Sequence, residues 1–179
     1  EAMESLLHQQ PYLLGERFTL ADASAYGQLS MNLIDGAPAD LLHELAPKTF
    51  DWLCAIRDGK HRGANGQLYL SDALKPLLEI IGQTFVPLMQ QNAVAYEQAI
   101  KDGETLFNEA AFDRGRALYN GELMGYPFRA VVKTFQVRVW YELKVRWQGL
   151  TADSRDSLKA YVPLSTRTAL ADQSGLERQ

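Results

Sequence analysis

The residues best suited to chemistry in this chain are few and widely spaced. His8, His43 and His61 show neither paired spacing nor an HExxH motif, so they predict no metal site. Cys54 is the single cysteine. It excludes an intramolecular disulfide and a cysteine-based metal cluster, and it fits a reducing compartment. Its place on an apolar helical face favours core packing over a reactive thiol.

The richest candidate for ligand binding is the segment 129–147, where basic and aromatic side chains alternate. Such interleaving is found in nucleic-acid-binding proteins. The aromatic residues recur at helical spacing, however, which favours a buried aromatic face and a solvated charged face over a nucleic-acid interface. An anionic ligand, such as an organic acid, stays open, with Arg129 and Trp140 as candidate contacts. The alternating residues are Arg129, Lys133, Arg138, Lys144 and Arg146, with Phe135, Trp140, Tyr141 and Trp147.

Composition is that of an ordinary globular protein, but charge is unevenly distributed. The 179 residues are 46% apolar and 22% charged, with a net charge of −4. No run approaches the roughly 20 apolar residues of a membrane span. With the lone cysteine, this predicts a cytoplasmic protein with no membrane partner. Residues 128–179 carry 9 basic and 5 acidic side chains, which suits either an anionic ligand or docking onto the acidic remainder.

Thr19 and Asp22 predict a strong helix start within "GERFTLADASAYGQL". The hydroxyl of Thr19 suits an N-cap, and the carboxylate of Asp22 can reach back to the N–H of Thr19. The two residues would thus close a capping box. We expect the helix to run from Leu20 to about Leu33, with small residues that admit a neighbouring helix closely. By contrast, "EAMESLLHQQ" at the start predicts the end of a helix, so we expect a fragment or a processed product.

Proline and glycine divide the first part of the chain. Pro38 predicts a loop. Pro47 splits the apolar segment that follows this loop, because proline removes an N–H and clashes with the preceding turn. The polar, glycine-rich stretch 59–67 predicts the main boundary. We therefore expect one unit over residues 1–66 and a second over 67–179.

The second unit is also predicted to be mainly helical. We expect a long helix over 71–100, kinked at Pro87. Glycines and mixed alternation over 104–128 predict an irregular or hairpin insert. A helix over 129–148 and a last short helix, capped by Thr151 and ended by Pro163, complete the chain. The apolar stripe expected on the helix 129–148 comprises Val132, Phe135, Val139, Leu143 and Trp147.

The segment "PYLLGERFTLADASAYGQL", followed by "APKTFDWLCAIRDG", resembles the C-terminal all-helical domain of glutathione S-transferases. In that family a glycine turn and a capping box open the central helix of the domain, and Thr19 and Asp22 match that box. The resemblance covers residues 1–59. It implies an all-α fold: a helical bundle of the glutathione-transferase C-terminal type, with the additional helical segment 67–179 packed on it.

The same resemblance implies a function for the full-length protein. That function is conjugation of glutathione, as co-substrate and without metal, to an apolar small-molecule electrophile by a cytoplasmic, bacterial-type homodimer. In the family, a Tyr, Ser or Cys of an upstream thioredoxin-like domain activates the thiol, so this chain would hold no catalytic residue and be inactive alone. Tyr26 is the expected substrate contact, while Arg129 and Trp140 are candidates for an anionic conjugate. The alternative is a non-catalytic module of glutathione-transferase type, used for binding or assembly.

Overall fold

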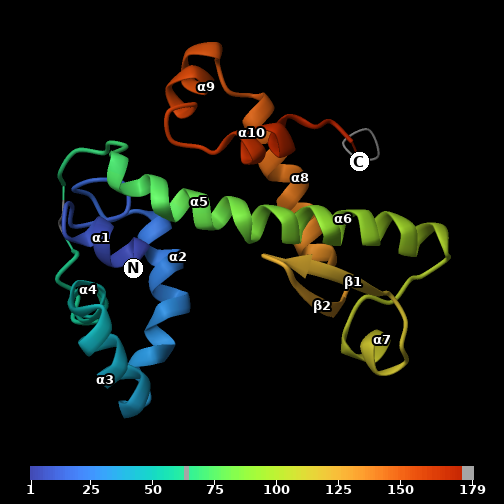
Figure 1. Cartoon of the computed structure of the whole chain (residues 1–179), viewed down its shortest axis with the longest axis horizontal. Coiled ribbons are helices and arrows are strands. Elements are labelled where there is room, and N and C mark those ends of the chain that lie inside the picture. The colour runs from blue at the N-terminus through green and yellow to red at the C-terminus, as the bar shows by residue number, and fades with distance from the viewer. Residues whose placement is uncertain (63–64, 175–179) are drawn as a thin grey trace. The chain divides into compact units, whose positions relative to one another are not determined.

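The computed structural model describes residues 1–62 and 65–174, and this part of the chain is mainly helical with a two-stranded antiparallel sheet (Figure 1). It forms two compact units, Glu1–Leu77 and Leu78–Gln179. Their division falls within helix α5 (Lys75–Gln83), later in the chain than the boundary expected at residue 66. Among the described residues, no helix combines the length and apolar character needed to cross a membrane.

The first unit is built around helix α4. This helix packs against α1, α2 and α3, and its buried face carries Trp52, Leu53 and Ile56. Pro47 is the first residue of α4, where proline has no intrahelical N–H to lose, so the predicted split at Pro47 is present. The elements of this unit that precede α5 are α1 (Ala2–Leu7), α2 (Leu20–Leu29), the 3-10 turn η1 (Ser30–Leu33), α3 (Gly36–Leu45), α4 (Pro47–Arg57) and the 3-10 turn η2 (Asp72–Leu74).

The loop expected at Pro38 was wrong, because Pro38 lies in the first turn of α3. Asp35 caps this helix, its side chain accepting from the backbone N–H of Ala37 at 3.2 Å. The first-turn N–H groups of a helix have no intrahelical partner, so proline is tolerated there. The cap at Asp35 therefore predicts a helix start here more reliably than Pro38 predicts a loop.

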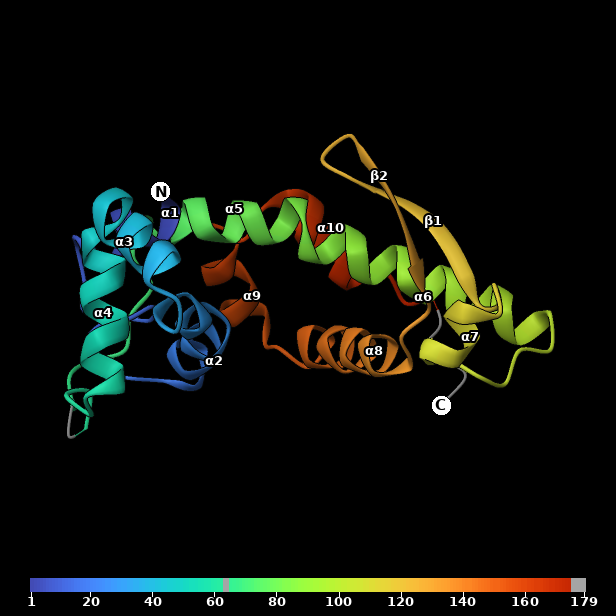
Figure 2. The same cartoon turned by 90° about the horizontal axis from the view of Figure 1, so that it is seen from below.

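The second unit is organised by helix α6, which contacts α8, α10 and strand β1. Figure 2 shows the β1–β2 hairpin turn projecting away from α8. The core between the helices includes Val86, Met89, Val137, Trp140 and Leu170. After α5, the described elements are α6 (Phe85–Lys101), α7 (Glu109–Asp113), β1 (Leu118–Leu123), β2 (Tyr126–Val131), α8 (Thr134–Gln148), α9 (Ala152–Leu158) and α10 (Leu164–Ala171).

The single long helix expected over 71–100 is instead divided at Thr84, between α5 and α6. Pro87 lies three residues later and has no N–H to donate to the carbonyl of Gln83, so the helical hydrogen-bond ladder fails before the proline. The N–H and the hydroxyl of Thr84 both donate to the carbonyl of Ile80, at 3.0 and 2.7 Å. Thr84 is therefore hydrogen-bonded even though the helix is interrupted there.

The helix expected to begin at Arg129 was also wrong at its start. Arg129 lies in β2 and pairs with Asn120 of β1, and α8 begins only at Thr134. Met124 and Gly125 form the two-residue turn of the hairpin with φ of +51° and +84°. Two successive positive φ values are typical of a type I′ turn, whose twist matches that of antiparallel strands. The pairing partner on β1, not the local sequence, decides the state of residue 129.

The buried face of α8 also differs from the apolar stripe that the sequence predicted. Phe135, expected in the apolar stripe, is 64% exposed, whereas Val137, Trp140 and Tyr141 are buried. At the end of the chain, α9 ends at Leu158 and Pro163 is the N-cap of a further helix, α10. Proline suits that position because its fixed φ and missing N–H cost nothing at a helix start.

Candidate functional site

The capping box expected at Thr19 and Asp22 is present and belongs to a larger network. The carboxylate of Asp22 is 0% exposed. Its Oδ2 accepts from the backbone N–H and the hydroxyl of Thr19 at 2.9 and 2.7 Å, and its Oδ1 accepts from the backbone N–H of Leu13 at 2.8 Å. A buried carboxylate needs such donors to offset its desolvation. Asp22 therefore fixes the loop from Leu13 to Thr19 on the first turn of α2.

Tyr26 lies one turn after Asp22 on α2 and is half-buried against the apolar cluster of Trp52, Leu53 and Ile56. Tyr12 packs on the same cluster. Burial raises the pKa of Tyr12, and the charge of Asp22 raises it further, so this phenol stays protonated at neutral pH. The apolar surroundings of Tyr26 suit a side chain that packs in the wall of an apolar site.

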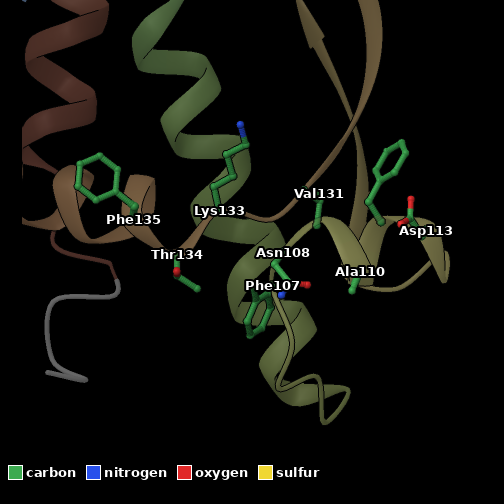
Figure 3. A pocket seen from close by; sticks show the side chains of 9 residues that line it. Phe107, Asn108, Ala110, Asp113, Val131, Lys133, Thr134 and Phe135 are labelled. Carbon is green, nitrogen blue, oxygen red and sulfur yellow. The ribbon is translucent and has the colours of Figure 1, made fainter.

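The second unit contains a cavity of about 890 Å³, open to solvent, between α7, the end of β2 and the start of α8 (Figure 3). Its volume is that of a site for a small organic molecule. Apolar side chains dominate it, with charged groups from Asp113 and Lys133 among the lining residues. The residues that line it are Phe107, Asn108, Ala110, Phe112, Asp113, Val131, Lys133, Thr134 and Phe135.

Two amide side chains on α6 anchor nearby backbone, one at the cavity residue Lys133 and the other at Glu122 of the hairpin. Asn92 is buried, and its amide accepts from the N–H of Lys133 at 2.9 Å and donates to the carbonyl of Lys133 at 3.0 Å. Gln91 makes the same two-bond contact with the backbone of Glu122 on β1, at 2.8 and 3.0 Å. Lys133, which directly precedes α8, is therefore fixed by Asn92, while the hairpin is fixed by Gln91.

Sequence reasoning missed this cavity because residues 104–128 carried only loop and hairpin signals. A signal was nevertheless present at Asn108. Its side chain accepts from the N–H of Ala111 at 3.3 Å and so caps α7. Asparagine before a short run of helix formers is typical of a helix start. The resulting turn of helix brings Phe107 and Phe112 to the same cavity.

Of the remaining candidates, Arg129 is exposed on β2, and Trp140 is in the core of the second unit with 2% of its surface exposed. The indole of Trp140 is therefore closed to a ligand in this structure. Arg129 and Trp140 both belong to the second unit and Tyr26 to the first. The cavity lining includes none of the three.

Lys144 does not belong to the solvated charged face expected for segment 129–147, since it is 1% exposed. Its ammonium donates to the carbonyl of Ser174 at 2.7 Å and lies 3.8 Å from the carboxylate of Asp172. It also lies 6.0 and 5.8 Å from the ring centres of Trp140 and Tyr141. The lysine is buried because the segment after α10 folds over it and supplies the oxygen atoms that a buried ammonium requires.

The three histidines lie in separate places and contact neighbouring side chains. His8 is exposed and lies 3.4 Å from Glu4, His43 contacts the ring of Phe50, and His61 packs on Phe18 with ring centres 4.3 Å apart. Within residues 1–62 and 65–174, no group of three or more His, Cys, Asp or Glu side chains is placed to hold a metal ion.

The fold and cavities define a mainly helical protein with ligand-sized pockets on helical scaffolds. No known protein family, curated protein or solved structure matches this chain.

Proposed function

We propose that this chain is the helical, substrate-side part of a glutathione-transferase-like enzyme that conjugates glutathione to an apolar electrophile. The observation that carries the proposal is the buried network of Thr19 and Asp22 at the start of α2. These are the residues on which the resemblance to the C-terminal domain of glutathione transferases rests. The order of the next helices, with Pro47 opening α4 and Trp52 on its buried face, supports the same assignment.

In this proposal the chain binds the electrophile and leaves thiol activation to a thioredoxin-like domain. Acceleration of thiol attack needs a group that favours the thiolate and holds it near the electrophile. Tyr12 has a raised pKa and is therefore a poor source of such activation. Tyr26, packed on the α4 cluster, contributes an apolar wall.

The first test uses residues 1–179 alone. Calorimetric titration with glutathione is expected to give no micromolar affinity, and conjugation of chlorodinitrobenzene is expected to stay at the uncatalysed rate. Micromolar binding of glutathione would contradict the division of labour proposed here. Charge reversal of Arg129, Lys133 and Arg138 would then test whether this basic segment holds the two carboxylates of glutathione.

The second test joins the chain to any segment that its gene encodes before Glu1. A thioredoxin-like segment with a Tyr, Ser or Cys near its first strand is expected to restore conjugation. In the active protein, Tyr26→Leu should raise the KM for the electrophile, whereas Tyr126→Leu, at a position that is 78% exposed, should not. If an unrelated domain precedes the chain, or no electrophile in a panel reacts, a non-catalytic binding or assembly module becomes the better account.

A further inference from the structure

Two of the five asparagines in this chain stand directly before a glycine, Asn65 before Gly66 and Asn120 before Gly121. The side-chain amide of asparagine reacts with the backbone nitrogen of the next residue, and glycine favours this reaction because it has no Cβ to hinder the nitrogen. The nitrogen must lose its proton to react, so an N–H held in a hydrogen bond protects the asparagine before it. The local structure therefore decides which of the two sites is reactive.

The site at Asn120 is protected, because it lies inside β1, where Gly121 pairs with Phe128 of β2. In an antiparallel pair of strands, every second pair of residues exchanges both backbone hydrogen bonds. The N–H of Val132 donates to the carbonyl of Ala117 at 2.9 Å, and Gly121 lies four residues after Ala117, on the same alternation. The N–H of Gly121 is therefore bonded to Phe128 and cannot attack the amide.

The site at Asn65 has the opposite surroundings. Asn65 is exposed, and neither it nor Gly66 belongs to a helix or a strand. Among the residues that the structure describes, none accepts a hydrogen bond from the N–H of Gly66. The hydrogen bonds begin at the next residue, Gln67, whose N–H donates to the carboxylate of Glu16 at 3.1 Å and whose carbonyl accepts from the N–H of Glu16 at 2.9 Å. The nitrogen of Gly66 is thus available to the amide of Asn65.

We propose that Asn65 is a site of spontaneous modification, at which the amide becomes a carboxylate and the segment after it is released. The nitrogen of Gly66 gives its proton to water and bonds to Cγ of Asn65, while the Cγ–Nδ2 bond breaks and ammonia leaves with a proton. The product is a succinimide ring. Water then opens the ring: cleavage at Cγ gives aspartate, and cleavage at the backbone carbonyl carbon gives isoaspartate. Water replaces ammonia, so the mass rises by one unit.

The isoaspartate product should disturb the contact between Gln67 and Glu16. Its main chain runs through the former side chain and is one carbon longer directly before Gly66. Gly66 has no room to shift toward Glu16, since a Cβ added to Gly66 would lie 2.2 Å from the Cβ of Glu16. The new carboxylate also adds a negative charge close to that of Glu16, and like charges repel. Both changes weaken the two hydrogen bonds between Glu16 and Gln67.

These two bonds are one end of a longer contact that holds the segment Gln67–Tyr69. The N–H of Tyr69 donates to the carbonyl of Leu14 at 3.1 Å, and Leu68 forms an antiparallel bridge with Gly15. Loss of one end should let the other N–H groups open to solvent more often. This modification goes beyond the proposed transferase function. Neither glutathione nor an upstream domain takes part in it, so the two proposals fail or succeed separately.

The first test incubates the full chain in mildly alkaline buffer, both folded and in urea, and follows the peptides that contain Asn65 and Asn120 by mass spectrometry. In the folded chain, Asn65 should gain one mass unit about tenfold faster than Asn120 or more, since Asn120 reacts only when the hairpin opens. In urea the two sites should react at similar rates, which is the internal control. Equal rates in the folded chain, or an Asn65 that reacts only in urea, would overturn the proposal.

The second test measures the release of the segment. Ion exchange separates the modified chain, which carries one more negative charge, and hydrogen exchange of the N–H groups of Glu16 and Tyr69 should be about tenfold faster in it than in the unmodified chain. Asn65→Asp carries the charge without the longer main chain and should show a smaller increase. Asn65→Gln closes the ring far more slowly, so it should stay unmodified and keep the original exchange rates. Unchanged exchange in the modified chain would overturn the release.

Discussion

The carboxylate of Glu4 on α1 accepts hydrogen bonds from the backbone N–H and the hydroxyl of Thr49 on α4, at 2.8 and 2.9 Å. It also accepts from the N–H of Lys48 at 2.9 Å. Ala46, the N-cap residue of α4, has no side-chain oxygen for these free first-turn donors. A residue distant in sequence thus caps α4 and fixes α1 on it.

The substitution Glu4→Gln should destabilise the protein by about 1–2 kcal/mol at pH 7, because the neutral amide accepts fewer and weaker hydrogen bonds. Urea unfolding measures this loss. The exposed Glu44 on α3 gives the matched control, Glu44→Gln, which should change stability by less than about 0.5 kcal/mol. Equal effects of the two substitutions would contradict the capping role.

The stability that Glu4 contributes should also depend on pH. Burial raises the pKa of Glu4, but the hydrogen bonds from Lys48 and Thr49 and the charge of His8 outweigh it, so the pKa lies below its ordinary 4.5. As pH falls, the unfolded chain therefore takes up this proton first. The difference between the native chain and Glu4→Gln should be complete above about pH 5.5 and shrink as pH falls through the folded-state pKa. A difference that grew on acidification would have the wrong sign.

The capping box predicts unequal effects for its two residues. Thr19→Ala should cost about 0.5–2 kcal/mol, as removal of a cap usually does. Asp22→Ala should cost more, about 2–4 kcal/mol, because it leaves the N–H groups of both Thr19 and Leu13 without their acceptor. The double variant should lose less than the sum, since both residues serve one network. Urea melts of the four proteins test this, and full additivity would count against a shared network.

Asn92 should matter more than its neighbour Gln91. Both amides bind a backbone N–H and carbonyl, but Asn92 is fully buried, whereas the contacts of Gln91 are exposed. Asn92→Ala removes a fully buried amide and leaves the N–H of Lys133 without its acceptor, while the carbonyl of Lys133 keeps the N–H of Val137. It should cost about 1–3 kcal/mol. At Gln91, water replaces the lost partner, and Gln91→Ala should cost about 1 kcal/mol or less. Thermal or urea unfolding that ranked the two variants in the opposite order would refute this reading of the hairpin anchors.

Lys144→Met should release the segment that follows α10. Methionine keeps most of the volume of Lys144 but cannot bind the carbonyl of Ser174. Because an apolar replacement also removes the desolvation of a buried charge, we expect a stability change within about 1 kcal/mol. The segment Asp172–Ser174 should nevertheless be cleaved faster in limited proteolysis followed by mass spectrometry. Lys159→Met, at an exposed ion pair with Asp156, is the control and should leave the cleavage rate unchanged.

The sequence by itself determined the features that rest on neighbouring residues. The box of Thr19 and Asp22 and the start of α4 at Pro47 are local, because each depends on backbone groups within one helical turn. The mainly helical class follows in the same way from the apolar periodicity of the chain.

Only the tertiary structure decided the features that depend on partners far along the chain. Arg129 is in a strand because β1 pairs with it, and Lys144 is buried because the segment after α10 folds over it. The cap that Glu4 provides for α4 has no local signature. Backbone groups and charges must be satisfied wherever the fold buries them, and the sequence does not state which distant residue will do so.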